Sequence, residues 1–445
     1  MKQRIFLSPP YMFGNERELV DEAFASNYIA PCGPMVERFE LALAESVGVP
    51  HACALASGTA ALDLLCHELR IAPGDTIFCS NLTFVASIAP AVHRGAVPVF
   101  IGSDEASWTI SPSLLEEALE VARRAGKLPR AVVAVDLYGQ CCDYAVLEEL
   151  CQRYEVPLIV DAAEALGAGY CDHTVVTMER LKGLLQPQSG CNQEVKRGSE
   201  RQAAEGREVL NSTLQPLGGC KKGGCKKGWR QAGDAGWAAI YSFNGNKIIT
   251  SSGGGMLVSR DQGLIERACK RAQQSRNPKV WYEHSELGYN YRMSNIVAAI
   301  GLGQLMNLER IVVKKRRIFE LYQERLGDLP GVEFMPEAAY GRCNRWLTVM
   351  RLKASGMGGG SKPGCPSALV LRVVAALEAA NIEARPVWKP MHLQPVFAGS
   401  QVYGAQVDEE IFRSGICLPS GTGLSQDEIG RVADIVRGVV CCYSV

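Results

Sequence analysis

The sequence predicts an α/β fold built on a mostly parallel sheet with helices on both faces, and three observations support it. From residue 51 onward, short apolar runs rich in β-branched residues alternate with amphipathic stretches at helical spacing. The apolar runs show no clean alternation of polar and apolar positions, which is typical of strands buried on both faces. Of the 445 residues, 47% are hydrophobic, enough for a sizeable core and two domains.

The expected elements follow one another in strand-to-helix order along residues 51–170. The expected strand runs are HACALAS, TIFCS, VPVFI, AVVAVDLYG and VPLIVDAAEAL. The helical stretches between them are AALDLLCHEL, SIAPAVHRG, LLEEALEVARRAG and AVLEELCQRY. Ser111 can cap the third of these helices, because Pro112 suits the first helical position. Strands separated by helices in this way predict parallel pairing.

Residues 171–232 break the alternation. They are rich in Gly, Lys, Arg, Gln and Ser, and they repeat the pentapeptide GCKKG within GGCKKGGCKKGW. This composition buries too little apolar surface to offset the entropy of ordering, so we expect a disordered or surface-loop insertion. Because long surface insertions cost little closure entropy, we expect it to loop outward.

The second half of the chain predicts the rest of the sheet and a smaller domain. Strand patterns resume at AAIYSF and GGMLVS, and long helical patterns follow in NIVAAIGLGQLMNLERIVVKKRRIFELYQERL. We expect residues 1–310 to form an N-terminal arm and a large domain, and residues 311–445 to form a small α+β domain. A Gly/Ser-rich stretch at 355–364 predicts a loop within the small domain.

Charge and cysteine content narrow the class of protein. The 47 Lys and Arg residues balance 47 Asp and Glu residues, which argues against a dedicated nucleic-acid or membrane-surface protein. No apolar run is long enough to span a bilayer, and the N-terminal MKQRIFLSPP is too short in apolar residues for a signal-peptide core. The 17 cysteines are scattered, several inside apolar runs, where free Cys behaves as a small hydrophobe. We therefore expect a reduced, cytoplasmic setting.

Polar groups follow three of the predicted strands, and ligands of such sheets bind at the carboxyl ends of strands. At the first, Ser57, Gly58 and Thr59 form a strand-to-helix turn. Gly58 allows close backbone approach, and Thr59 and Ala60 would offer free amides at a helix N-terminus, which suits an anion such as phosphate. An ordinary helix cap explains the same residues, since one glycine does not make a phosphate loop.

At the second strand end, Asp161 closes the apolar run PLIV. An ionised carboxylate there is costly without a cationic or hydrogen-bonding partner. Asp161 could instead cap a following helix, and with Glu164 three residues later the pair also resembles a capping box. The spacing alone does not decide between these interpretations.

At the third strand end, Lys247 lies between YSFNGN and a cluster of glycines. It could be a solvated loop residue, as most lysines are. In a dry pocket its amine would be a nucleophile toward a carbonyl. A phosphate site, a strand-end carboxylate and a lysine, in this order, are the groups that a pyridoxal phosphate (PLP) enzyme requires.

Several motifs recur in the order found in one enzyme family. They are SPPYMFGNE, APCGPMVERFE, SGTAALDL, NLTFVASIAPAVHRGAVPVFI, VDAAEALGA, GDAGWAAIYSFNGNKIITSSGGGML, ELGYNYRMSNIVAAIGLGQL, IEARPVWKPMHLQPVF and CLPSGTGLS. With these motifs the chain resembles the nucleotide-sugar aminotransferases of the DegT/StrS type, PLP enzymes of fold type I. The resemblance covers nearly the whole chain outside 171–232 and 355–364. Relatives usually join the strands of Asp161 and Lys247 by a short connection, of which Gly233-Asp234 remains here.

The resemblance implies roles for individual residues. Lys247 would hold PLP as a Schiff base and move the proton, and Asp161 would pair with the pyridine nitrogen. Glu164 would lie near the 3-hydroxyl of PLP, and Phe84 would stack on its ring. The residues that would bind the phosphate of PLP are Gly58, Thr59, Ala60 and Ser242, joined by Asn290 from the partner subunit of a homodimer. The residues that would bind the sugar nucleotide are Tyr28, Arg292 and His392.

The implied reaction is a transamination in two halves. Glutamate would load its amino group onto PLP, and the amino group would then pass to a keto group on a nucleotide-linked sugar. The segments LSPPYMFGNE and RPVWKPMHLQPVF most resemble members that act on UDP-linked 4-keto-6-deoxy-N-acetylhexosamines, as in bacillosamine-type pathways.

Other functions remain as alternatives. A PLP sugar dehydratase of the same family would have histidine in place of Lys247. A binding or regulatory protein would use the insertion, in which Cys191, Cys220 and Cys225 with His173 form a weak zinc pattern. The lysines at 221–222 and 226–227 could contact nucleic acid, but a solvated charge run explains them equally. A sugar-nucleotide-binding pseudo-enzyme is less favoured, because all the expected chemical groups are present. We expect no metal.

Overall fold

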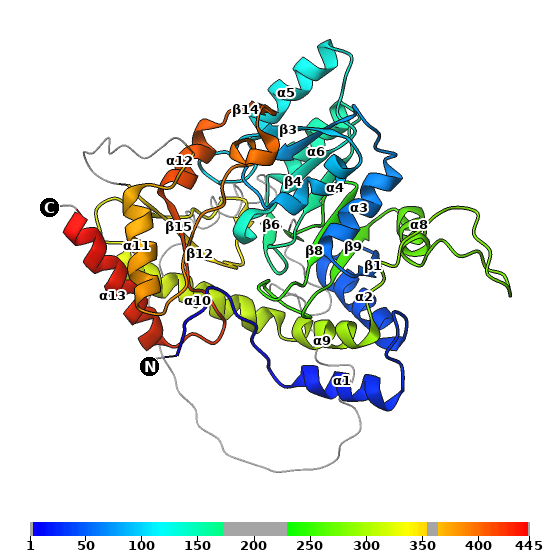
Figure 1. The fold of residues 1–445 in the computed structure, drawn as a ribbon, viewed down its shortest axis with the longest axis horizontal. Coiled ribbons are helices and arrows are strands. Elements are labelled where there is room, and N and C mark those ends of the chain that lie inside the picture. The colour runs from blue at the N-terminus through cyan, green and yellow to red at the C-terminus, as the bar shows by residue number, and fades with distance from the viewer. Residues whose placement is uncertain (1–2, 172–228, 354–363, 444–445) are drawn as a thin grey trace, which may run out of the picture.

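The computed structural model describes residues 3–171, 229–353 and 364–443, and its centre is an eight-stranded sheet (Figure 1). In spatial order the strands are β1 (His51–Leu55), β9 (Gly255–Ser259), β8 (Ala238–Ser242), β5 (Leu158–Asp161), β4 (Val132–Val135), β2 (Thr76–Ser80), β3 (Val97–Ile101) and β14 (Gln401–Tyr403). Neighbours pair in parallel except β9, which is antiparallel to β1 and β8. The predicted mostly parallel sheet is confirmed.

Both faces of this sheet are buried, which explains why the polar residues of its strands stand only at the strand ends. On β4, Val132 and Ala134 belong to one hydrophobic core and Val133 to the other. On β5, Val160 and Ile159 divide between the same two cores. Because successive side chains point to opposite faces of a strand, the positions of β4 and β5 are apolar up to Asp161, which stands at the end of β5.

Helices supply the other side of each core. The first core is covered by α2 (Pro34–Val47), α5 (Pro112–Arg124), α6 (Tyr144–Arg153) and α9 (Asn295–Leu305), with α1 (Asn15–Ala25) alongside α9. The second is covered by α3 (Gly58–Glu68), α4 (Ala89–His93) and α8 (Gln262–Ala272). Ser111 caps α5 as predicted, because its hydroxyl accepts a hydrogen bond from the Leu114 amide and Pro112 opens the helix.

The C-terminal part has its own sheet and core. The antiparallel strands are β10 (Val332–Phe334), β12 (Thr348–Leu352), β15 (Gly415–Leu418) and β13 (Arg385–Pro386), in that spatial order. Its helices are α10 (Leu308–Leu326), α11 (Ala368–Ala379), α12 (Gln406–Ser414) and α13 (Gln426–Tyr443). Apolar residues of α10, α11, α13 and this sheet form a third core.

Three features cross the expected boundary between residues 310 and 311. Helix α10 runs through this point without a break. Ile5, near the start of the chain, is buried in the C-terminal core. Strand β14, from the C-terminal part, pairs with β3 at the edge of the large sheet. The division into 1–310 and 311–445 remains a prediction.

The two ends of the predicted insertion are ordered, which corrects the limits 171–232. Strands β6 (Gly169–Cys171) and β7 (Trp229–Gln231) pair with each other, and β11 (Gly341–Arg342) pairs with β6. Cys171 lies opposite Trp229, so the chain leaves and re-enters at neighbouring positions of one small sheet. The weak zinc pattern of Cys191, Cys220, Cys225 and His173, the paired lysines and most of 355–364 lie outside the described residues.

The long helical pattern after residue 294 is two helices, α9 and α10, bent by 59° to each other at Met306 and Asn307. Asn307 terminates the first helix by donating a side-chain hydrogen bond to the Gly303 carbonyl, 3.0 Å away. Within the described residues no single helix has the length and apolar character to cross a membrane, whereas this bent pair together meets that test by length and composition only.

Candidate active site

One cavity of about 880 Å³ lies at the carboxyl ends of β1, β2, β4, β5 and β8. The loops that follow these strands form its floor, the N-terminal residues 6–10 form one side, and the C-terminal part closes another. The sequence-predicted residues among its lining are Gly58, Thr59, Phe84, Asp161, Glu164, Ser242 and Lys247. The fold therefore brings together residues that are almost 190 positions apart in the chain.

Asp161, the last residue of β5, is buried and held by two hydrogen bonds. The Ser87 hydroxyl donates to its Oδ2 at 2.6 Å, and the Ala163 amide donates to its Oδ1 at 3.1 Å. Burial raises the pKa of this carboxyl, while the two hydrogen bonds and the charge of Lys247 act in the opposite direction. The carboxylate is thus fixed in orientation at the strand end.

Glu164 is also buried, and it faces Lys247. The Tyr138 amide donates to its Oε2 at 2.6 Å, and the Lys247 ammonium lies 3.7 Å from its Oε1. Burial raises the pKa of Glu164 to about 7 despite the lysine charge, and the nearby Asp161 adds to the rise. Because residues 163–167 form a turn, no helix follows Asp161 for it to cap, and the capping-box alternative is wrong.

Lys247 lies in the turn that follows β8, and its side chain is nearly buried. Its Nζ lies 4.6 Å from the centroid of the Trp346 ring, a cation–π distance. The alternative of a solvated loop lysine is wrong, because this amine points into a cavity between a carboxylate and an indole face.

The turn between β1 and α3 has the form predicted for a phosphate site, with one correction. Ser57 caps α3, and its hydroxyl already accepts a hydrogen bond from the Ala60 amide at 3.0 Å, so this amide is not free. Ala60 also lies outside the cavity lining, whereas Gly58 and Thr59 are part of it. A Cβ on Gly58 would lie 3.2 Å from the Tyr241 carbonyl oxygen, so glycine allows the turn to pack against β8, beside Ser242.

Aromatic side chains cover the cavity, and two of them were not predicted. Phe84 is 55% exposed within it, and its ring lies 5.4 Å from that of Trp388. Trp388 also contacts Tyr138 at 5.5 Å, and Trp346 lies beneath Lys247. Trp346 and Trp388 come from the C-terminal part, so no local sequence pattern connects them to Lys247. Ser87 was missed too, since a serine in a short turn carries no distinctive signal.

Besides Ala60, four predicted residues lie outside the lining of this cavity. Tyr28 and Asn290 are exposed on the surface. His392 lies between the Asn81 and Glu409 side chains, with ring nitrogens 3.0 and 3.1 Å from their oxygens. None of these four residues, the fourth being Arg292, reaches the cavity of its own chain. Their roles in binding remain predictions.

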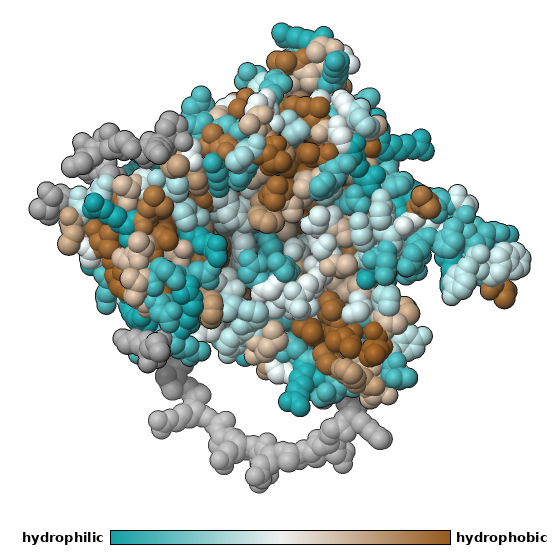
Figure 2. Space-filling model, in the orientation of Figure 1, coloured by the Kyte–Doolittle hydropathy of each residue, from teal (hydrophilic) through white to brown (hydrophobic). Residues whose placement is uncertain are grey.

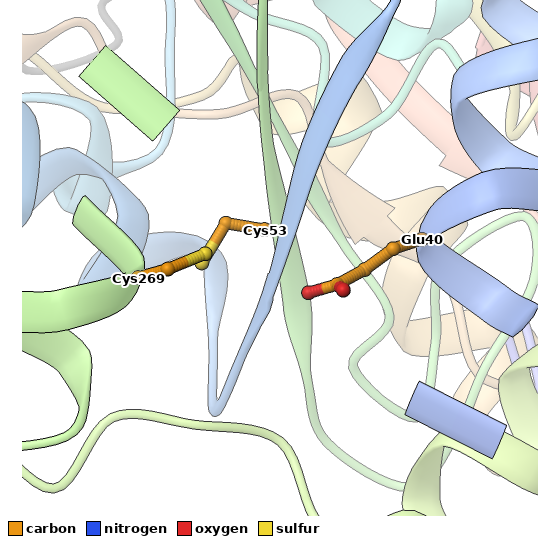
Figure 3. A group of neighbouring side chains, drawn as sticks. All are labelled: Glu40, Cys53 and Cys269. Atoms are coloured by element: carbon orange, nitrogen blue, oxygen red, sulfur yellow. The ribbon is translucent and has the colours of Figure 1, made fainter. Parts of the chain in front are cut away.

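Glu40, Cys53 and Cys269 form a separate cluster (Figure 3). Arg292 contacts all three of these side chains. The three potential ligand atoms of this cluster lie within 4.8 Å of one another. The Arg292 Nη1 lies 2.6 Å from the Glu40 carboxylate and 3.2 and 3.7 Å from the two sulfurs. A guanidinium that already occupies this position disfavours a metal cation.

The residues of the cavity fit PLP. A primary amine, a buried carboxylate at a strand end, an exposed aromatic face and a helix N-terminus are present together in one cavity. These are the groups that would hold the aldehyde carbon, the pyridine nitrogen, the ring and the phosphate of PLP. The described ends of the insertion, β6 and β7, contribute nothing to the lining.

Comparisons with known proteins agree on one family. Residues 10–183 and 209–437 match the model of the DegT/DnrJ/EryC1/StrS aminotransferase family. The chain is 43% identical over 440 residues to EpsN of Bacillus subtilis (strain 168), described as a "Putative pyridoxal phosphate-dependent aminotransferase", covering 98% of this chain and 96% of the relative. It is 31% identical to the GDP-perosamine synthase of Caulobacter vibrioides, covering 96% of each chain. The crystal structure of the aminotransferase TlmJ from Streptoalloteichus hindustanus shares the fold, with a TM-score of 0.77, 23% identity and coverage of 99% and 100%.

Proposed function

The chain belongs to the DegT/DnrJ/EryC1/StrS aminotransferase family and is a PLP-dependent sugar aminotransferase, and we propose that it moves an amino group from glutamate to a nucleotide-linked keto-sugar. The observation that supports this proposal best is the position of Lys247. Its amine lies 3.7 Å from a buried glutamate, in one cavity with a strand-end aspartate. A dehydratase is disfavoured, because that class has histidine at this position.

The proposed roles of the residues follow from their positions. When bound, PLP supplies an electron sink for the carbon that gains or loses the amino group. Lys247 holds the cofactor and moves a proton at that carbon. Asp161, oriented by Ser87, keeps a proton on the pyridine nitrogen. Glu164 lies near the cofactor hydroxyl, and Phe84 covers the ring. Gly58, Thr59 and Ser242 hold the phosphate at the start of α3.

The sugar we propose is a UDP-linked 4-keto-6-deoxy-N-acetylhexosamine, and the product would serve glycan or polysaccharide synthesis. The motifs LSPPYMFGNE and RPVWKPMHLQPVF support this choice, and both contribute residues to the cavity wall. The Caulobacter relative is named for a GDP-linked product. A GDP-linked keto-sugar is therefore the competing substrate that the experiment must include.

We also propose a homodimer in which Asn290 completes the phosphate site of the partner. Asn290 is exposed and lies outside the cavity of its own chain. It belongs to the segment after α8, which extends away from the sheet (Figure 1). The exposed apolar residues of this segment are Val280, Trp281, Tyr282 and Leu287.

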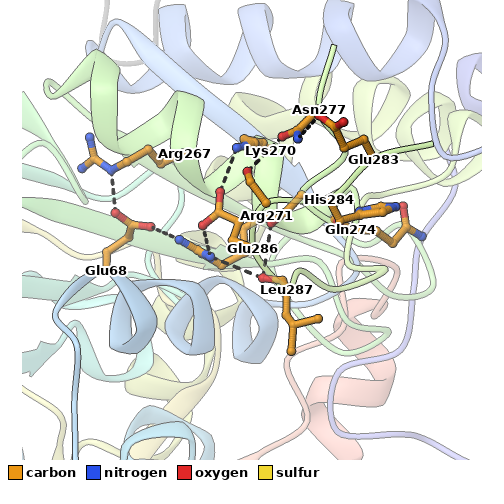
Figure 4. A network of polar contacts seen from close by, with 12 residues as sticks. Glu68, Arg267, Lys270, Arg271, Gln274, Asn277, Glu283, His284, Glu286 and Leu287 are labelled. Carbon is orange, nitrogen blue, oxygen red and sulfur yellow. Dashed lines mark hydrogen bonds and ion pairs between the residues drawn. The ribbon is translucent and has the colours of Figure 1, made fainter. Parts of the chain in front are cut away.

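A charged network fixes the base of this segment to the body of the protein (Figure 4). Arg271 of α8 lies 2.9 Å from Glu286 and 3.4 Å from Glu68 of α3. The Lys270 ammonium contacts Glu286 at 2.9 Å as well. A segment held at its base and apolar beyond it is suited to contact a second copy.

The surface near α1 offers a further apolar area. Figure 2 shows apolar side chains gathered on the face where α1 and α9 lie. The exposed apolar residues of the α1–α2 region are Phe24, Tyr28, Ile29 and Leu41. We propose a cytoplasmic location for the dimer, since the cysteines that the structure describes are free thiols, most of them buried.

The test is an absorbance spectrum of the purified protein with PLP, before and after glutamate, followed by a panel of UDP-, GDP- and dTDP-linked keto-sugars. We expect a visible band in the wild-type protein that decays with glutamate and returns with the accepted sugar. Lys247→Ala should lose the band, whereas the control Lys314→Ala, a surface lysine, should keep it. A Lys247→Ala protein that still forms the band would refute the assigned role of Lys247. A wild-type band that glutamate leaves unchanged would refute the donor.

A further inference from the structure

Lys315 of α10 is a buried lysine that the proposed reaction does not use. It is 2% exposed. Among the described residues, no carboxylate lies within 4.0 Å of its Nζ. Burial of this ammonium lowers the pKa of Lys315 to about 7. A buried ammonium without a carboxylate partner is costly, so its hydrogen bonds are of interest.

The contacts of Lys315 lead to the wall of the active site. Its Nζ donates to the Ser8 hydroxyl at 3.2 Å and to the Trp346 carbonyl oxygen at 3.1 Å. The Ser8 hydroxyl donates in turn to the Asn246 carbonyl oxygen at 3.0 Å. Lys315 therefore connects the N-terminal arm and the C-terminal part through two hydrogen bonds.

Asn246 is the residue before Lys247, and its carbonyl oxygen is the meeting point of the network. It accepts the Ser8 bond and a second one from the Trp346 indole nitrogen, at 2.6 Å. The same Trp346 ring lies 4.6 Å below the Lys247 amine. Lys315, Ser8 and Trp346 thus hold the peptide that presents Lys247, and Trp346 is also the surface on which the Lys247 amine rests.

We propose that Lys315 is a positioning residue for the aminotransferase reaction, which holds Ser8, Trp346 and the Asn246–Lys247 peptide in the arrangement that places the Lys247 amine. The proposal rests on the proposed role of Lys247. Two hydrogen bonds to one carbonyl fix the backbone before Lys247, and Lys315 fixes both donors. Ser8, Asn246, Lys247 and Trp346 all line the cavity, so the network also sets the position of the N-terminal arm there.

The test compares Lys315→Met with Lys314→Met. Methionine keeps the length of the side chain and removes both donated hydrogen bonds. Lys314 is the neighbouring residue of α10, is exposed, and contacts the ring of Tyr11 instead of the network. Hydrogen exchange of residues 5–10 and 244–248 is measured in cofactor-free protein, and kcat and KM for glutamate are measured with PLP.

We expect exchange in both segments to be at least tenfold faster in Lys315→Met and unchanged in Lys314→Met. The kcat should fall about tenfold to a hundredfold while KM stays within twofold, because a small displacement of a reacting group slows the chemical step. Ser8→Ala should produce part of the same loss, and the double variant should lose less than the sum of the two, since both act through one carbonyl.

Unchanged exchange in Lys315→Met, or full additivity with Ser8→Ala, would overturn the proposal. If Lys315→Met does not fold, Ser8→Ala alone tests the proposal. The two measurements on this variant are hydrogen exchange at residues 244–248 and the absorbance maximum of the Lys247-bound cofactor. A wild-type protein without PLP binding or turnover would instead contradict the role of Lys247, and the exchange comparison in cofactor-free protein separates these two failures.

Discussion

At the scale of residues, the site places two buried carboxyl groups and one amine close together, and their surroundings separate their roles. Asp161 receives hydrogen bonds from Ser87 and Ala163, which stabilise its charged form. Glu164 receives one from Tyr138 and depends on Lys247 for the rest of its stabilisation. Burial raises the pKa of both carboxyls, but different neighbours oppose the rise at each one.

The raised pKa of Glu164 predicts a pH-dependent stability. In the unfolded chain its pKa is 4.5, and in the folded protein it is about 7. Between these values the folded state binds more protons, so the free energy of unfolding falls as pH rises from 4.5 to 7. Glu164→Gln cannot titrate. We expect cofactor-free wild type to lose on the order of 3 kcal/mol relative to Glu164→Gln over this range, as measured by urea unfolding.

Parallel unfolding curves for the two proteins from pH 4.5 to 7.5 would contradict this prediction. The control is Glu149→Gln on α6, whose surface carboxyl is 69% exposed. This variant should follow the wild type at every pH.

At the scale of elements, the turns after the strands are shaped by close backbone contacts. Tyr138, after β4, has a φ of 50°, a left-handed conformation that is unfavourable for tyrosine and aims its amide at Glu164. Beyond β8, Gly255 at the start of β9 lets this strand approach the turn that begins α3. The position of the predicted phosphate site thus depends on β9 as well as on the turn itself.

Gly255 provides a test at this scale. A Cβ on Gly255 would lie 2.3 Å from the Gly58 nitrogen and the Ser57 carbonyl carbon, and these backbone atoms cannot move aside. We expect Gly255→Ala to lower the free energy of unfolding by about 1–3 kcal/mol, typical of overpacking, and to weaken PLP binding. Chemical denaturation and a PLP titration measure the two effects.

Gly253→Ala is the matched control, since a Cβ there meets no atom within 4 Å. It should leave the unfolding free energy within about 0.5 kcal/mol of wild type. If both variants behave alike, close packing of β9 on the turn does not explain the glycine at 255.

At the scale of the whole molecule, the cavity needs segments from the entire chain. Its floor comes from the large sheet, one wall from residues 6–10, and another from Trp346 and Trp388. The N-terminal segment reaches this position because Ile5 is buried in the C-terminal core. The arm, the sheet and the C-terminal part must therefore assemble together before the site exists.

The proposed homodimer gives a prediction at the same scale. Trp281→Glu places a charge in the exposed apolar segment after α8, which is not part of the cavity lining of its own chain. If this segment contacts a second copy, the variant should shift toward monomer in light scattering after gel filtration. Its PLP affinity should fall at least tenfold, because a monomer receives no Asn290 from a partner subunit at its phosphate site.

Trp281→Phe, which keeps the apolar surface, should remain dimeric and active. A Trp281→Glu monomer with wild-type PLP affinity would contradict the completion of the site by a partner subunit. A Trp281→Glu dimer would contradict the proposed contact.

Much of the fold and part of the site could be predicted from the sequence, because their signals are local. The apolar runs that became β1 to β5, β8 and β9 are continuous, and each demands burial by itself. Asp161 and Lys247 stood out because each follows such a run, where a charge is costly. The short β14 has no such signal, and it joins the sheet only because the C-terminal part packs beside β3.

The sequence by itself determined the sheet, the family resemblance and the order of Gly58, Asp161 and Lys247 at strand ends. The tertiary structure decided which groups surround them: Trp346 below the Lys247 amine, Ser87 on Asp161, Tyr138 on Glu164, and Lys315 behind the wall. It also showed Arg292 paired with Glu40 and the Ala60 amide bound to Ser57. The physical reason is range: hydrophobic runs and turn residues act on their neighbours in the chain, whereas burial, hydrogen bonding and ion pairing depend on residues that only folding brings into contact.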